Sequence, residues 1–224
     1  MRLRWRRRTY RRMTMRISDR LELRPSFFVF WTAACLLDAD GTLPLFVLAA
    51  AVHELGHAAA VYLAGGRVER MVLYAAGACM QVRHGRGYTG DLVIAAAGPL
   101  AGALAAWVSA QAGWVSFAGA NLILSLFNCL PIVPLDGGCM LSFLLCLSPL
   151  GLRGGDVLRA LSLVQSLVLT GLGACLLVRT GNSIALLVIG LMLTAGNLGC
   201  GRMPLETNKI SWYTKASLMK SAEK

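Results

Sequence analysis

The sequence predicts an all-α membrane protein with about six transmembrane helices and a short β-hairpin at the membrane edge. Its mean hydropathy is +0.61. Hydrophobic residues make up 56% of the 224 positions and charged residues only 15%, a composition atypical of a water-soluble globule. The charges are also segregated, since apolar runs alternate with short basic loops and 10 of the 22 basic residues lie within the first 24 positions.

The apolar runs define six predicted spans, which are residues 26–37, 43–64, 92–112, 115–147, 157–178 and 183–198. With the N-terminus in the cytoplasm, the inner side of the membrane holds 21 of the 22 basic residues, and only Arg179 lies outside. Inner loops are enriched in Lys and Arg, so this partition supports both the span count and cytoplasmic N- and C-termini. The basic tail is expected to face anionic lipid rather than nucleic acid, because membrane segments follow it at once.

Three regions follow from this layout. They are a basic cytoplasmic N-terminal segment (1–25), a six-span domain (26–200) and a short C-terminal tail (201–224). The first span is the shortest, because residues 26–37 cover only about 18 Å of helix against a hydrocarbon core of about 30 Å. We expect it to extend at its ends or thin the bilayer, and to stay attached, because no small-residue cleavage site follows it.

The loop between the second and third spans has structure of its own. Residues 67–82 are rich in Val, Leu, Met and Tyr, with Gly77 near the middle. This pattern predicts two short strands at the membrane edge. A plain amphipathic re-entrant loop is the alternative.

The second span contains the motif H-E-x-x-H, as His53-Glu54-Leu55-Gly56-His57. Such a string is expected by chance about once in a thousand chains of this composition. On an α-helix the two histidines project from one face with Cβ atoms about 6 Å apart, which suits two ligands of one tetrahedral Zn²⁺. Glu54 lies beside them and can accept a proton from the attacking water. A polar patch buried only for helix packing is disfavoured, because a carboxylate in hydrocarbon is costly.

A second motif, N-C-L-P-I-V-P-L-D-G-G, occupies residues 128–138 of the fourth span. Its prolines and glycines cannot form a regular helix, and irregular backbone at membrane depth is tolerated only where it is buried in protein or lines a watery cavity. A catalytic zinc commonly has three protein ligands plus water, so Asp136 is the predicted third ligand. Cys129 and Cys139 flank the motif and leave a thiolate ligand as an alternative. The seven cysteines lack a C-x-x-C pair and are not expected to form disulfides.

The two motifs and the intervening A-G-P-L-A-G at residues 97–102 together resemble the site-2 protease family of intramembrane zinc metalloproteases. The resemblance covers roughly residues 26–200 and is strongest to the sporulation branch, whose members release a membrane-tethered sigma factor. Only 24 residues follow Cys200 and the longest loop has 27, so we expect neither the CBS domain nor the PDZ insert of other members.

The resemblance implies roles for seven residues of this chain. The zinc ligands would be His53, His57 and Asp136, the catalytic base Glu54, and the residues shaping the substrate groove Asn128, Pro131 and Pro134. It also implies a membrane-embedded or membrane-tethered substrate whose helix can unwind, regulatory membrane proteins as partners, and a place in the bacterial cell membrane. An edge strand of the predicted hairpin could hold the unwound substrate by strand addition.

Two other classes of function are open. A metal transporter would need several polar sites along a path, whereas the third, fifth and sixth spans hold no ionisable residue in their interiors. A catalytically inactive, metal-binding membrane scaffold would usually have lost its base, whereas Glu54 is present. A zinc metalloendopeptidase of the site-2 type is therefore the prediction.

Overall fold

The computed structural model describes residues 15–18, 21–23, 25–38, 41–74, 77–83, 87–148, 151–180 and 184–199. Most of the predicted basic N-terminal segment and the predicted C-terminal tail lie outside these ranges. The described elements are β1 (Met15–Ser18), β2 (Leu21–Leu23), α1 (Pro25–Leu37), α2 (Leu43–Leu63), β3 (Arg67–Tyr74), β4 (Gly77–Arg83), α3 (Gly87–Gln111), α4 (Val115–Asn128), α5 (Asp136–Leu147), α6 (Gly151–Thr180) and α7 (Ile184–Gly199).

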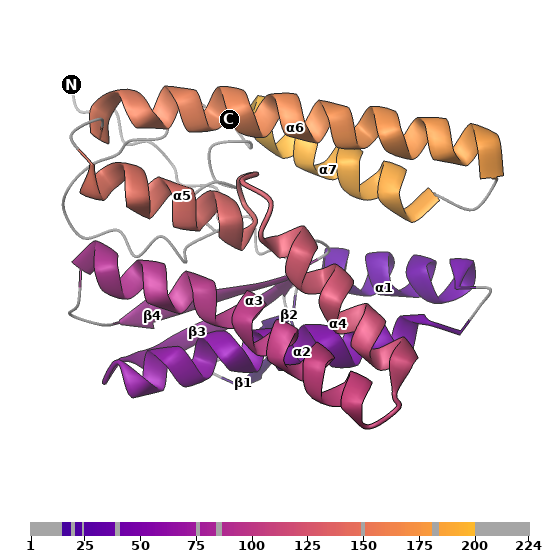
Figure 1. The fold of residues 1–224 in the computed structure, drawn as a ribbon, viewed down its shortest axis with the longest axis horizontal. Coiled ribbons are helices and arrows are strands. Elements are labelled where there is room, and N and C mark those ends of the chain that lie inside the picture. Colours follow the sequence, from indigo (N-terminus) through magenta and orange to yellow (C-terminus); the bar gives the residue numbers. More distant parts are fainter. Residues whose placement is uncertain are drawn as a thin grey trace, which may run out of the picture.

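The helices lie along the long axis of the molecule, as Figure 1 shows, and each predicted span corresponds to helical structure. Among the described helices, α2, α3 and α6 are each long and apolar enough to cross a membrane. The fourth predicted span is interrupted as expected, because α4 ends at Asn128 and α5 begins at Asp136. Both halves pack against α3, so α4 and α5 together run back along α3 (Figure 1).

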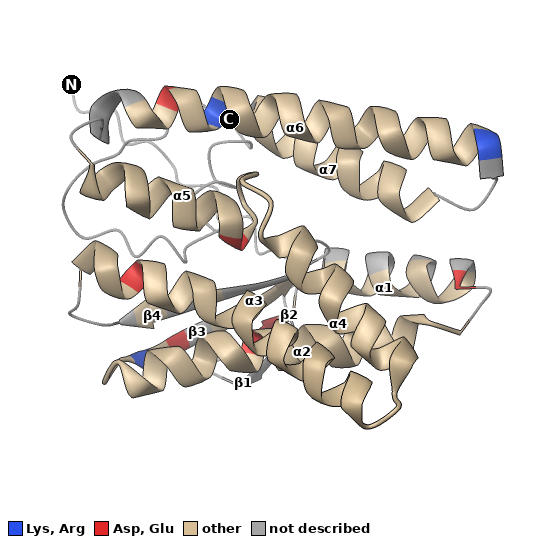
Figure 2. Cartoon of the chain, viewed as in Figure 1, with Lys and Arg blue, Asp and Glu red and all other residues tan. Residues whose placement is uncertain are grey.

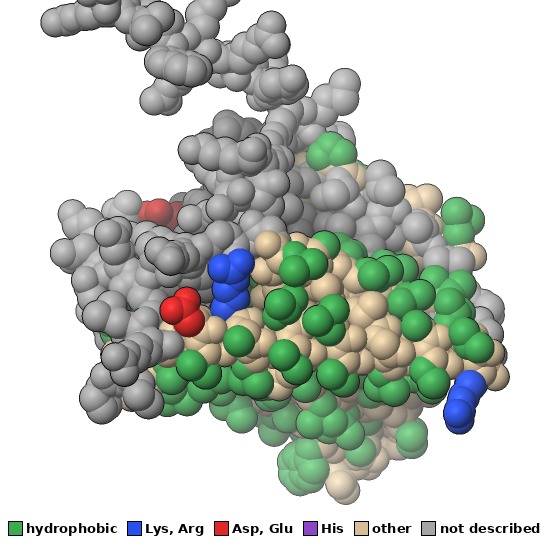
Figure 3. Space-filling model, turned by 90° about the horizontal axis from the view of Figure 1, so that it is seen from above, with side chains coloured by type: hydrophobic (Ala, Val, Ile, Leu, Met, Phe, Trp, Pro, Cys, Tyr) green, Lys and Arg blue, Asp and Glu red, His purple; other side chains and the backbone are tan. Residues whose placement is uncertain are grey.

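The outer surface of the helices is apolar. Figure 3 shows hydrophobic side chains spread over the face that α6 dominates. Exposed aliphatic side chains on this helix include Val157, Val164, Val168 and Val178. Figure 2 shows that, on the described elements, charged residues are few along the long helices and lie mostly towards helix ends and in the sheet. A surface of this kind is suited to lipid rather than to water.

The four strands form one sheet in the order β1-β2-β3-β4. The two strands predicted within residues 67–82 are confirmed as the antiparallel pair β3 and β4, so the re-entrant loop is wrong. Strands β1 and β2 were not predicted, because their residues fall in the basic N-terminal segment. They belong to the sheet because β2 pairs in parallel with β3, placing Leu21 opposite Met71.

The sheet is anchored to the helices close to the metal-ligand motif. Val61 near the end of α2, Met80 and Val82 of β4, and Ile94 of α3 form one buried cluster. This cluster joins the sheet to the helix that carries His53 and His57. The sheet therefore stands beside the site.

Two helices begin earlier than the apolar runs. Helix α3 starts at Gly87 and α6 at Gly151, against predicted starts at 92 and 157. The first turns of both helices carry polar residues, so a span defined by its apolar run begins after them. Helix α1 has only 13 residues, or about 20 Å, so it remains shorter than a bilayer core.

Candidate metal centre

Helix α2 presents both motif histidines to the interior. His53 and His57 are buried and lie one turn apart, with ring centroids separated by 4.8 Å and ring planes at 85°. Their Nε2 atoms are 3.1 Å apart. The start of α2 is held by Asp38, whose carboxylate accepts hydrogen bonds from the backbone N–H groups of Thr42 and Leu43, both at 3.0 Å. The structure thus places the two histidines side by side on one face of α2, and their role as metal ligands stays a prediction.

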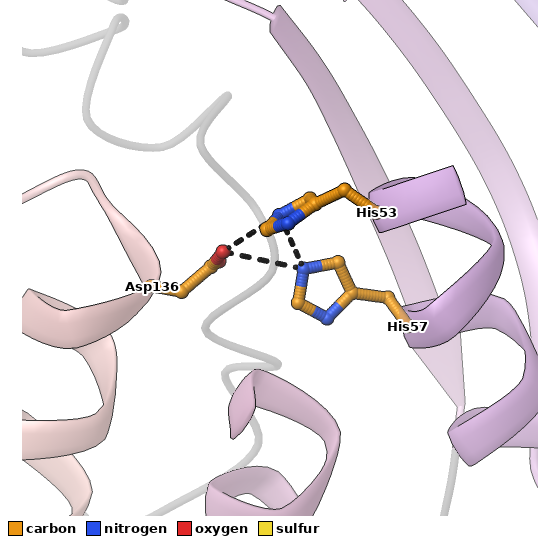
Figure 4. Close-up of side chains that lie close together, drawn as sticks. All are labelled: His53, His57 and Asp136. Atoms are coloured by element: carbon orange, nitrogen blue, oxygen red, sulfur yellow. Dashed lines mark hydrogen bonds and ion pairs between the residues drawn. The ribbon is translucent and has the colours of Figure 1, made fainter. Parts of the chain in front are cut away.

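Asp136 approaches these histidines from the opposite side, as Figure 4 shows. It is the first residue of α5, and its side chain points towards the two histidines of α2. Its Oδ2 atom lies 2.9 Å from His53 Nε2 and 3.3 Å from His57 Nε2. One potential ligand atom from each of the three residues lies within 4.8 Å of the others. The structure thus brings together all three residues that the sequence predicts as ligands.

The chemistry of this donor set suits a metal ion. His57 Nδ1 is 2.7 Å from the carbonyl oxygen of Ile94, which can only accept, so Nδ1 carries the proton and Nε2 of the neutral ring presents a lone pair. Within the described part of the chain, the buried Asp136 Oδ2 finds no hydrogen-bond partner of good geometry. Several lone pairs therefore converge on one buried point. A divalent cation satisfies them together, and two imidazoles with a carboxylate are ligands that zinc accepts.

Glu54, the predicted base, lies on the same turn of α2 and is half-buried. Glu54 is not one of the three residues whose ligand atoms converge, and its role as the base stays a prediction.

Helix α3 fits closely against the histidine helix, and two glycines make this approach feasible. A Cβ atom on Gly98 would collide with the imidazole of His57. A Cβ atom on Gly56 would collide with the Ala101 side chain and the Ala97 backbone, the nearer at 2.5 Å. Gly98 lies in the A-G-P-L-A-G segment at residues 97–102, whose sequence gives no indication of a contact with a ligand. Its contact with a ligand, and the Ile94 carbonyl that orients that ligand, were missed because both depend on how α2 and α3 pack.

The loop before Asp136 is tied to the first turn of α5. A Cβ atom on Gly137 would collide with the carbonyl oxygen of Cys129, and one on Gly138 would meet the Ile132 backbone at 2.6 Å. The D-G-G sequence therefore lets the loop fold back onto the helix that carries the ligand. Cys129 and Cys139 do not belong to the described metal-ligand group, which contains only the two histidines and the aspartate.

The three residues assigned to a substrate groove lie in the segment that leads from the end of α4 to Asp136. Asn128 ends α4 and donates a hydrogen bond from Nδ2 to the carbonyl of Leu124, at 3.0 Å. Pro131 and Pro134 are half-buried in the loop between α4 and α5. Their role in holding a substrate stays a prediction.

Comparison with known proteins agrees with this geometry. Residues 27–199 match the family described as Peptidase M50B-like. Stage IV sporulation protein FB of Bacillus subtilis is 30% identical over 136 residues, covering 56% of this chain and 47% of that protein. The chain thus spans about half the length of this curated relative.

The fold is similar to that of a Site-2 Protease from Methanocaldococcus jannaschii, with a TM-score of 0.63 at 22% sequence identity. The match covers 88% of this chain and 97% of the solved one. The apolar helices and the family match make this an integral membrane protein. Because the family match extends over most of its length, the chain belongs to the Peptidase M50B-like family.

Proposed function

We propose that the chain is an intramembrane zinc metalloprotease that hydrolyses peptide bonds of membrane-embedded or membrane-tethered proteins. The observation that carries this proposal is the convergence of His53, His57 and Asp136 at a buried point among apolar helices. Family membership supports the same reaction class. Glu54 on the same helix supplies the acid-base group that hydrolysis requires.

The three convergent side chains would hold the zinc, with the Ile94 carbonyl fixing the orientation of His57. A zinc ion at such a site makes water more acidic and polarises a carbonyl group. Glu54 accepts a proton from the attacking water and returns it to the leaving amine. The apolar helices around the site exclude bulk water, which strengthens the electrostatic interactions within it.

The substrate must present an extended backbone to this site. The loop that contains Pro131 and Pro134 is not helical and leads directly to Asp136, so we assign it, with Asn128, to the substrate groove. Among the described strands β4 is at an edge of the sheet, and an unwound segment could add to it through main-chain hydrogen bonds. A transmembrane helix that unwinds easily is the expected substrate.

The similarity to a sporulation protein supports a role in releasing a membrane-tethered transcription factor in a bacterial cell membrane, under control of regulatory membrane proteins. The distribution of basic residues supports cytoplasmic N- and C-termini. Co-expression with candidate tethered factors tests this context. Failure to process any of them would remove the support for it.

The test of the activity combines metal content with cleavage. The parent chain and Glu54→Gln are purified in detergent, zinc is quantified, and each is incubated with a single-span model substrate. The parent is expected to hold about one zinc and cut, and Glu54→Gln to hold zinc without cutting. If both bind zinc and neither cuts, the metal-binding scaffold is favoured; if neither binds zinc, the site assignment is wrong.

A further inference from the structure

Two polar side chains on later helices form hydrogen bonds with the loop that leads to Asp136. Val133 is buried, and its backbone N–H donates to Ser162 Oγ of α6 at 3.1 Å. Its carbonyl oxygen accepts from Asn197 Nδ2 of α7 at 3.0 Å. Both polar groups of one peptide residue, three positions before the third ligand, are thus bound by side chains of α6 and α7.

Loss of either bond would leave a buried backbone group of Val133 without a hydrogen-bond partner. Ser162 is fully buried and Asn197 is 4% exposed, so water does not replace either bond if its side chain is removed. The Asn197 amide divides its two donors between Val133 and the Leu193 carbonyl of its own helix, at 2.9 Å, which orients the side chain. Ser162 also reaches the carbonyl of Pro131, at 3.5 Å. A buried backbone group that loses its partner is costly, so the loop would rearrange without them.

The connection to the metal centre is short. Gly137 and Gly138 lie directly against the backbone of Cys129 and Ile132, so loop and first helical turn form one unit. A shift of Val133 would therefore carry Asp136 with it. Asp136 Oδ2 lies 2.9 Å from His53 Nε2, and a displacement of about 1 Å would move it away from the point where the ligand atoms converge.

We propose that Ser162 and Asn197 are positioning residues for the third metal ligand, acting through the backbone of Val133. Helices α6 and α7 thereby complete the metal site although they contribute no ligand. This inference rests on the proposed metal-binding function. It is distinct from it, because it predicts which residues outside the ligand set control metal affinity.

The test compares two variants that lose a bond to the loop with two controls that lose a polar bond elsewhere in α6 and α7. Ser162→Ala and Asn197→Leu remove the bonds to Val133. Their matched controls are Ser166→Ala and Thr194→Val. Ser166 is as buried as Ser162 but bonds only within α6, to the Leu163 carbonyl at 3.0 Å, and Thr194 bonds Thr170 across α6 and α7 at 3.1 Å without reaching the loop.

Zinc affinity is measured by competition with a chelator of known affinity on full-length protein in detergent, so no cleavage is needed. We expect Ser162→Ala and Asn197→Leu to weaken zinc binding about tenfold to a hundredfold, and both controls to leave it within about twofold. Equal affinities in test and control variants would overturn the proposal. A parent that binds no zinc would refute the proposed function itself, and this inference with it.

A cycle with Asp136→Ala separates positioning from general damage to the fold. If the bonds from Ser162 and Asn197 to Val133 act through Asp136, Asn197→Leu should have no further effect on the residual zinc affinity of Asp136→Ala. An equal loss with and without Asp136 would contradict the proposal. Should Asn197→Leu fail to fold, the smaller Ser162→Ala change gives the same comparison.

Discussion

Gly98→Ala provides the most direct test of how closely α3 supports the metal centre. The added Cβ atom would lie 2.5 Å from Cε1 and 2.8 Å from Cδ2 of His57. Carbon atoms in contact prefer about 3.5 Å or more, so the imidazole or the helix must move by about 1 Å. A movement of that size breaks the 2.7 Å bond between His57 Nδ1 and the Ile94 carbonyl, because such bonds span only about 2.7–3.2 Å.

The expected loss can be estimated from this displacement. A 1 Å misplacement in a catalytic site reduces the rate by about a hundredfold. Overpacking costs about 1–3 kcal/mol, which the helix preference of Ala over Gly, about 0.5–1 kcal/mol, does not offset. Zinc affinity should fall with the rate, because the moved ring no longer presents Nε2 to the centre.

The matched control is Gly119→Ala, because a Cβ atom at that position of α4 has nothing within 4 Å. Both variants are assayed for zinc affinity, thermal stability and cleavage of a single-span substrate in detergent. Gly119→Ala should behave as the parent. If Gly98→Ala binds zinc and cuts as well as Gly119→Ala, the contact between Gly98 and His57 has no functional importance and the reasoning fails.

Three further predictions follow from the same geometry. Asp136→Ala should weaken both zinc binding and cleavage, measured by metal analysis and substrate assay; full zinc affinity would remove Asp136 from the ligand set. Gly137→Ala should also release zinc, because its Cβ atom would collide with the Cys129 carbonyl; an unchanged zinc content would show that the loop adapts. Chelation of zinc should lower the melting temperature of the parent and of Glu54→Gln, whose ligands are intact, but have little effect on Asp136→Ala. A melting temperature that does not respond to chelator in the parent would contradict a bound metal.

Much of the site could be predicted from the sequence because its signals are local. The spacing of His53 and His57 places them on one face of any helix. The prolines and glycines around Asp136 require an interruption, which α4 and α5 confirm. The predicted strands within residues 67–82 were found because an apolar pattern with a central glycine is also local.

The remaining features depend on pairs of residues far apart in the chain. Strands β1 and β2 join β3 and β4 through the pairing of β2 with β3, about 50 positions later, and both lie in what the sequence predicts to be a basic cytoplasmic segment. Ser162 and Asn197 are unremarkable polar residues in apolar spans until helix packing places them against Val133. The sequence does show each of them as a polar residue within an apolar span, which indicates a buried polar contact. It does not indicate which residue lies at the other end of that contact.

The central claim is that His53, His57 and Asp136 together hold a zinc ion. X-ray absorption at the zinc edge on the purified Glu54→Gln protein tests it directly, since this variant keeps the ligands without turnover. We predict two imidazole nitrogens and oxygen ligands at about 2.0–2.2 Å, with an oxygen contribution that changes in Asp136→Ala. A sulfur ligand at about 2.3 Å would instead assign the metal to a cysteine such as Cys129 or Cys139, and contradict the claim.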